Sequence, residues 1–164
     1  MLVEDRLNQA LTQAQRGNQL LVVCYLDLDG FKPVNDRFGH VAGDKLLIEV
    51  ARRMQATVRA HDSVGRLGGD EFELLLTNLE NAGEYQLILQ RVIKEIMQPI
   101  EIDDASMVTV GVSIGVTLYP ADGEDSDILL RHADQAMYQA KRSGRNRVCL
   151  FTPENQDGLD CGNA

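Results

Sequence analysis

Strict alternation between apolar and small side chains over residues 108–118 limits the fold of this chain more than any other feature. The apolar positions are Val108, Val110, Val112, Ile114, Val116 and Leu118, and the small ones are Thr109, Gly111, Ser113, Gly115 and Thr117. Because successive side chains of a β-strand point to opposite faces, this pattern predicts a central strand with one core face and one face open to close packing. A helix is the expected neighbour, although Gly111 or Gly115 could instead mark a β-bulge.

Composition indicates one globular domain. The 164 residues, 44% hydrophobic and 25% charged, are enough to build a single core. The formal net charge of -9 argues against a general binder of nucleic acid or anionic membranes, and the longest apolar run, residues 20–26, is too short to span a bilayer. Cys24, Cys149 and Cys161 are odd in number and lack metal-type spacing, so we expect free thiols and a cytoplasmic location.

Apolar periodicity divides the rest of the chain into helices and strands. The predicted helices cover residues 2–15 (ended by Gly17), 43–60, 82–97 (stopped by Pro99) and 127–142 (capped by Gly144). Further strands are predicted over residues 20–26, 63–67, 72–76 and 147–151, the last of them at a sheet edge. This order favours an α+β fold in which an antiparallel central sheet is flanked by helices.

Two glycines and two acids lie between the strands predicted at 63–67 and 72–76. Paired glycines permit positive φ and leave the backbone open to a ligand, so Gly68 and Gly69 are expected to form a β-hairpin turn. Asp70 and Glu71 then point to opposite faces, and one could bind a metal while the other accepts a proton. A solvated acidic turn is the alternative when the motif is taken alone.

A second acidic pair ends the apolar strand at 20–26. Asp27 and Asp29 share a face, with the carbonyl of Leu28 between them, which offers oxygen ligands to a hard cation. Taken alone, the pair could also simply mark the end of the strand. Asp44, expected in the first turn of its helix, and the basic residues of 141–147 could likewise serve only the helix dipole.

These motifs together resemble the GGDEF family of diguanylate cyclases over residues 5–150. The matching segments are DLDGFK at 27–32, ND at 35–36, FGH at 38–40, GD at 43–44, RLGGDEF at 66–72, SIG at 113–115 and KRSGRN at 141–146. The resemblance implies a fold similar to the polymerase palm and the class III nucleotide cyclases, with a ferredoxin-like architecture. It also implies the condensation of two GTP into cyclic di-GMP and two pyrophosphates. The catalytic domain is predicted to span residues 1–151, followed by a flexible tail over 152–164.

The resemblance also assigns roles to matching residues. Asp27, the Leu28 carbonyl and Asp70 are implied to bind Mg²⁺ or Mn²⁺, a donor set that suits these ions. Glu71 is implied to receive the proton of the 3′-hydroxyl, although metal-bound hydroxide could do so instead. Lys32 is implied to stabilise charge on the transferring phosphate.

The remaining implied residues bind GTP. Asn35 and Asp44 are implied to read guanine, with His40 as a lesser pocket residue. Lys141 and Arg145 are implied to contact the triphosphate, and Gly69 is also implied to bind the substrate. Asp44 suits guanine because the pairing edge of guanine presents two N–H donors and a carboxylate only accepts.

The segment from Arg59 to Asp62 resembles the RxxD inhibitory site of the family, with cyclic di-GMP as the implied ligand. A further arginine is expected from the next helix, where Gln90 or Arg91 falls, and we assign Arg91. A surface ion pair is the alternative.

Two features depart from the family pattern. The turn that normally precedes the domain is missing, which predicts a fragment of a longer signalling protein whose parent could be membrane-anchored. Glu73 replaces a small or apolar residue, and we interpret it as a solvent-facing strand position.

The expected partners are GTP, cyclic di-GMP and a second copy of the chain, because each chain has one hairpin while the product has two equivalent phosphodiester bonds. No contact with nucleic acid or membrane is expected. A module that binds GTP or cyclic di-GMP without turnover is the main alternative, and a dimerisation module is a third.

Overall fold

The computed structural model describes residues 2–81, 83–152 and 160–163. In chain order the elements are α1 (Val3–Gly17), β1 (Leu21–Asp29), α2 (Phe31–Phe38), α3 (His40–Thr57), β2 (Ser63–Gly68), β3 (Glu71–Leu76), α4 (Gly83–Ile96), β4 (Ile100–Asp103), β5 (Ser106–Val108), β6 (Gly111–Tyr119), α5 (Ser126–Arg142), β7 (Arg147–Leu150) and β8 (Asp160–Asn163). None of the helices in these ranges is long and apolar enough to cross a membrane.

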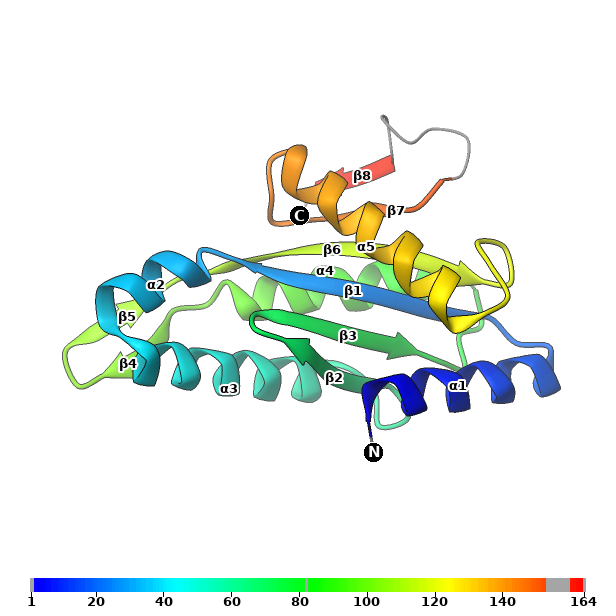
Figure 1. Cartoon of the computed structure of the whole chain (residues 1–164), viewed down its shortest axis with the longest axis horizontal. Coiled ribbons are helices and arrows are strands. Elements are labelled where there is room, and N and C mark those ends of the chain that lie inside the picture. The colour runs from blue at the N-terminus through cyan, green and yellow to red at the C-terminus, as the bar shows by residue number, and fades with distance from the viewer. Residues whose placement is uncertain (1, 82, 153–159, 164) are drawn as a thin grey trace.

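One sheet organises the domain. Its strand order is β2-β3-β1-β6-β7-β8, and every neighbouring pair is antiparallel except β6 and β7 (Figure 1). The predicted α+β class, a mostly antiparallel sheet flanked by helices, is confirmed. The alternating segment at 108–118 is not one strand, because Val108 pairs with Ile100 in the separate β4-β5 hairpin and β6 begins at Gly111.

Each face of the sheet is covered by its own pair of helices. On one face Val22, Cys24 and Leu26 of β1 join the largest core cluster with residues of α3 and α4. On the other face Leu21 and Val23 pack with residues of α1 and α5. Alternate side chains of β1 therefore pack into two different cores, as expected for a strand buried on both sides.

The small-residue face of β6 lies against α5. A Cβ at Gly115 would collide with the backbone of Ala133 and Met137, so only glycine permits this approach. The expected close packing by a helix is confirmed, and the β1-β6 register runs without a bulge.

Several boundaries differ from the sequence-based expectation. α3 begins at His40, which moves Asp44 from the first helical turn to the second. Gly17 is the last residue of α1, and Asn18, with a left-handed φ of 49°, is the C-cap. The strand predicted at the sheet edge is internal, because β7 lies between β6 and β8. Of the predicted tail, residues 153–159 lie outside the described residues, while Asp160–Asn163 forms β8.

The expectation of free thiols is wrong for two of the three cysteines. Cys149 of β7 and Cys161 of β8 form a disulfide, and they face each other in the strand register. Cys24 is free and buried. Spacing along the chain gave no sign of this pair, because the pairing of β7 with β8 brings the two residues together.

Glu73 is also placed differently from the expectation. Its exposed fraction is 2%, and it shares a face of β3 with the core residue Leu75. α1 covers this part of the sheet: Arg6 donates to the Val64 carbonyl over 2.9 Å. Burial raises the pKa of Glu73 to about 7, against the opposing effect of Arg6. The Oε1 atom of Glu73 has no hydrogen-bond partner in the described part of the chain.

Candidate active site

The predicted catalytic residues converge at one end of the sheet. The end of β1, the turn between β2 and β3, and the C-terminal end of α5 all point to this side (Figure 1). Asp27 lies opposite Glu71 in the β1-β3 register, and the backbone N–H of Leu28 donates to the Asp70 carbonyl over 3.2 Å. Three segments that are remote in sequence thus place their polar groups together.

Asp27 is in an environment that favours a nearby cation. Its side chain is 16% exposed, and its pKa is raised to about 6 because of burial and, to a smaller extent, the charge of Asp70. Lys141 partly offsets this effect, with Nζ lying 3.2 Å from Asp27 Oδ1. No group of three or more His, Cys, Asp or Glu side chains suited to a metal occurs within the described ranges. The predicted set, two carboxylates and the Leu28 carbonyl, fits a metal that takes its other oxygen ligands from a substrate.

The glycine turn leaves its backbone accessible. Gly69 has a φ of 51°, which favours glycine, and a Cβ at Gly68 or Gly69 would have no heavy atom within 4 Å. Arg66 Nε donates to the Gly69 carbonyl over 2.9 Å. The turn is therefore held in shape while its outer surface stays open to a ligand.

Glu71 has a partner that the sequence did not predict. The hydroxyl of Tyr25 donates to Glu71 Oε2 over 2.6 Å, across the β1-β3 pair. Burial, followed by this hydrogen bond, raises the pKa of Tyr25 well above its usual range, so the phenol stays protonated. Both residues lie on the α5 side of the sheet, as Asp27 does.

Two basic residues complete this side, one in the last turn of α5 and one in the turn that follows the helix. Lys141 lies between Asp27 and Asp29, at 3.2 and 3.3 Å. Arg145 Nη1 lies 3.6 Å from Asp29 and is 58% exposed, so most of its guanidinium is available to a ligand.

The residues predicted to bind the nucleoside gather around the α2-α3 junction. Asn35 Nδ2 and His40 Nδ1 lie 3.2 Å apart, and the Asn35 side chain occupies the space that a Cβ on Gly43 would need. Asp44 follows on α3 and lines a cavity of 460 Å³ together with Arg66 and Phe72. Lys32 is exposed on α2.

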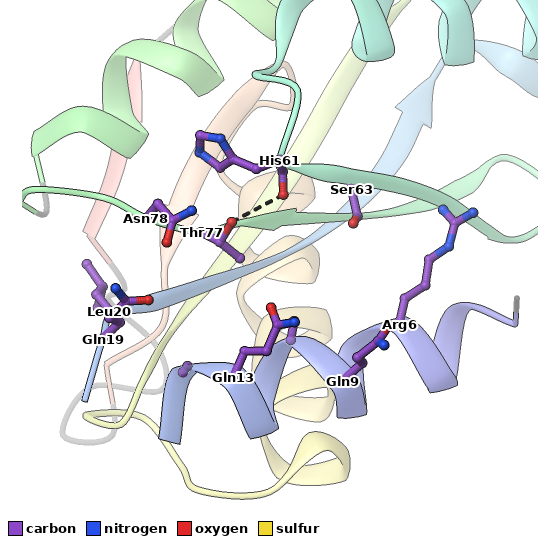
Figure 2. Close-up of a pocket in the computed structure, with 11 residues that line it drawn as sticks. Arg6, Gln9, Gln13, Gln19, Leu20, His61, Ser63, Thr77 and Asn78 are labelled. Atoms are coloured by element: carbon purple, nitrogen blue, oxygen red, sulfur yellow. Dashed lines mark hydrogen bonds between the residues drawn. The ribbon is translucent and has the colours of Figure 1, made fainter. Parts of the chain in front are cut away.

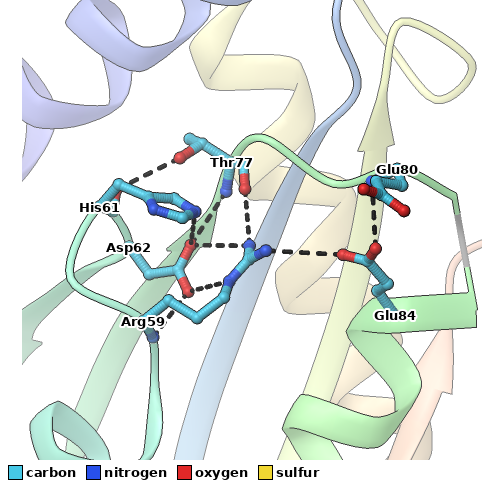
Figure 3. Close-up of polar contacts among 6 residues, drawn as sticks. All are labelled: Arg59, His61, Asp62, Thr77, Glu80 and Glu84. Carbon is cyan, nitrogen blue, oxygen red and sulfur yellow. Dashed lines mark hydrogen bonds and ion pairs between the residues drawn. The ribbon is translucent and has the colours of Figure 1, made fainter.

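Arg59 and Asp62 form a closed ion pair (Figure 3). Nε and Nη2 of Arg59 donate to the two Asp62 oxygens over 3.0 and 3.1 Å, and the Asp62 side chain is fully buried. Arg59 also donates to the Thr77 carbonyl over 2.6 Å and lies 3.5 Å from Glu84. The α4 residue beside Arg59 is thus acidic, and no ion pair joins Arg91 to Asp62 in the described ranges.

A second, polar pocket lies between α1 and the far ends of β2 and β3 (Figure 2). It has a volume of 290 Å³, and its lining includes Gln9 and Gln13 of α1 and His61, Thr77 and Asn78. His61 and Thr77 also border the Arg59–Asp62 pair, whose buried carboxylate accepts from the Thr77 N–H over 3.1 Å. No sequence pattern predicted this pocket.

Comparison with known proteins agrees with the fold. The family described as diguanylate cyclase, GGDEF domain, matches residues 1–147. MucR of Pseudomonas aeruginosa, a bifunctional diguanylate cyclase/cyclic di-GMP phosphodiesterase, is 49% identical over 92% of this chain and 22% of its own length. Diguanylate cyclase TpbB from the same species is 42% identical over 87% of this chain and 33% of its own length. The chain therefore spans only a minor part of these relatives.

Solved structures of GGDEF domains share the fold of this chain. The GGDEF domain of TpbB superposes with a TM-score of 0.88 at 40% identity, covering 93% of this chain and 88% of that one. The GGDEF domain of DgcB from Caulobacter crescentus, solved with cyclic di-GMP, superposes with a TM-score of 0.80 at 28% identity, covering 90% and 86%.

The α+β fold with acids at the tip of a glycine hairpin is that of the solved GGDEF domains. This chain belongs to the GGDEF family of diguanylate cyclases.

Proposed function

We propose that this chain condenses two molecules of GTP into cyclic di-GMP and releases two pyrophosphates. The observation that best supports this activity is the meeting of Asp27, Asp70 and Glu71 with Lys141 and Arg145 at one end of the sheet. Carboxylates beside basic residues are what a metal-dependent transfer of a nucleotidyl group requires.

Asp27, the Leu28 carbonyl and Asp70 are the residues that would hold Mg²⁺ or Mn²⁺. Such an ion supplies charge neutralisation and positioning of the attacking and leaving oxygens when it is bound. The raised pKa of Asp27, about 6, is consistent with a carboxylate whose anionic form needs a cation beside it.

Glu71 is proposed to accept the proton of the attacking 3′-hydroxyl. Tyr25 donates to Oε2, and among the described residues no side-chain hydrogen bond to Glu71 Oε1 occurs, so we assign this contact to Oε1. Lys141 and Arg145 bind the triphosphate, and Lys32 approaches the transferring phosphate from α2. Gly69 permits close passage of the nucleotide over the hairpin.

Asn35 and Asp44 are proposed to recognise guanine, with His40 supporting Asn35. The Asn35–His40 contact of 3.2 Å orients the amide, and Asp44 supplies the acceptor that the N–H edge of guanine requires. Adenine lacks that pair of donors, so GTP is the proposed substrate.

Catalysis requires two chains. One hairpin and one guanine site per chain can hold one GTP, while cyclic di-GMP contains two equivalent phosphodiester bonds. Two copies that meet face to face would bring each 3′-hydroxyl to the α-phosphate on the partner.

Arg59, Asp62 and Arg91 are proposed to bind the product as a feedback inhibitor. Glu84 lies 3.5 Å from Arg59, so cyclic di-GMP would have to displace this carboxylate to reach the guanidinium. Figure 3 shows Glu84 beside Arg59.

The test is incubation with GTP and Mg²⁺, with ATP as the control substrate, followed by identification of the products. We expect cyclic di-GMP and pyrophosphate from GTP only, and loss of both in Glu71→Gln. A domain that binds cyclic di-GMP without converting GTP would support the alternative of a regulatory module.

A further inference from the structure

We propose that Asp29 is a positioning residue that holds the phosphate-binding end of α5 in its working conformation. The inference rests on the proposed function, in which Lys141 and Arg145 bind the triphosphate. Asp29 itself is not among the residues to which the family resemblance gave a role.

Asp29 is buried and hydrogen-bonded on both oxygens. Its side chain is 10% exposed, and the Ser113 hydroxyl on β6 lies 2.9 and 3.0 Å from its two oxygens. The backbone N–H of Asn146 donates to Oδ2 over 2.8 Å. Lys141 Nζ lies 3.3 Å from Oδ1. One carboxylate thus joins β1, β6, α5 and the turn after α5.

That turn has an unusual backbone. Arg145 and Asn146 have φ values of 64° and 48°, two consecutive non-glycine residues in the left-handed region. Such residues persist only where the surroundings hold them. The bond from the Asn146 N–H to Asp29 is one such restraint, and the Asn146 side chain supplies others, accepting from the Val112 N–H over 3.3 Å and donating to Met97 Sδ over 2.9 Å.

Gly111 leaves room for this arrangement. A Cβ at Gly111 would lie 2.7 Å from Asn146 Oδ1, and Gly111 is the residue that pairs with Asp29 in the β1-β6 register. The start of β6 therefore accommodates the turn that Asp29 holds.

Asp29 also keeps Lys141 in place independently of Asp27. Lys141 is shared almost equally between the two carboxylates, at 3.2 and 3.3 Å. A cation bound at Asp27 would weaken one of these contacts and leave Asp29 to hold the lysine. Asp29 is thus placed to keep both Lys141 and Arg145 near the phosphates.

The test measures phosphate binding by calorimetry in the presence of Mg²⁺. The probes are inorganic tripolyphosphate and a GTP analogue with a methylene between the α- and β-phosphates, which cannot release pyrophosphate. Asp29→Asn should bind both probes at least tenfold more weakly, and its KM for GTP should rise more than its kcat falls. Ser113→Ala, which removes one neutral contact to the same carboxylate, should weaken binding less than threefold.

Asn146→Ala provides a second variant in case Asp29→Asn does not fold. It loosens the same turn while keeping the carboxylate, and should weaken tripolyphosphate binding at least threefold. Unchanged or tighter tripolyphosphate binding in either folded variant would overturn the role of Asp29. Failure of the unmodified protein to bind either probe would instead overturn the proposed function, and this inference with it.

Discussion

The hydroxyl of Tyr25 donates to Glu71 Oε2 over 2.6 Å, joining the middle of β1 to the first residue of the strand after the glycine turn. This bond limits the rotation of the carboxylate that we propose as the proton acceptor. It also requires Tyr25 to stay protonated, which the raised pKa of its phenol ensures.

Tyr25→Phe should therefore lower kcat while leaving the KM for GTP nearly unchanged. Without this bond the Glu71 carboxylate can rotate away from the attacking hydroxyl, and a misplaced general base is expected to lower kcat by roughly tenfold or more. Steady-state kinetics measure the effect, and Tyr138→Phe, on the exposed side of α5, is the matched control. A wild-type kcat in Tyr25→Phe would show that Glu71 needs no such support.

Glu73 should make stability depend on pH. Its folded-state pKa of about 7 lies above the ordinary value of 4.5, so the native state binds the proton more tightly than the unfolded chain. The stability from this group is complete below pH 4.5 and is lost as pH rises through 7. The loss has an upper bound of roughly 3 kcal/mol.

Glu73→Gln should accordingly raise the free energy of unfolding at pH 8 and change it little at pH 5. Denaturant titrations at the two pH values measure this difference, with Glu101→Gln on an exposed position of β4 as the control. Equal effects of Glu73→Gln at both pH values would mean that the buried carboxylate does not ionise in this range.

Asp27→Asn and Asp70→Asn should each abolish turnover while the fold is retained. Each variant removes a proposed metal ligand, and neither removes core packing. Titration with Mn²⁺, followed by its paramagnetic signal, should show weaker binding in both variants and normal binding in Asp36→Asn, an exposed site on α2. Near wild-type rates at low Mg²⁺ in either variant would exclude that residue as a ligand.

Arg59→Ala should weaken cyclic di-GMP binding more than tenfold, which corresponds to ~1.4 kcal/mol. It should also lower stability by about 1–3 kcal/mol, because Asp62 is buried and would lose its charged partner. Arg91→Ala separates the two effects, since Arg91 is exposed and should change ligand affinity alone. Calorimetry showing unchanged product affinity in both variants would remove the inhibitory site.

The rate of cyclic di-GMP formation should rise close to the square of protein concentration at low micromolar levels, because two chains must meet. Fusion of a parallel coiled coil ahead of Met1 should raise activity by making the encounter effectively unimolecular. The measurement is initial rate against concentration, with sizing of the same samples. A rate linear in protein where sizing shows only monomer would contradict the two-chain mechanism.

The sequence by itself predicted the four longest helices, most strands of the main sheet and the end of the domain where chemistry is expected, but not α2, the β4-β5 hairpin or β8. Side-chain period is a local property, so the apolar run at 20–26 and the alternation around Ile114 predicted strands from neighbouring residues alone. Gly68 and Gly69 likewise predicted the hairpin, although the structure places its turn at Gly69 and Asp70 and makes Gly68 the last residue of β2.

Only the tertiary structure decided which long-range partners these residues meet. Glu73 follows the side-chain alternation of β3, but its burial depends on α1 covering that face of the sheet. Asp29 meets the turn after α5, and Arg59 meets Glu84, because sheet order and helix packing bring together segments that no local pattern connects. The sequence therefore predicts which side chains a face presents, while packing decides what lies against that face and how the charges on it are paired.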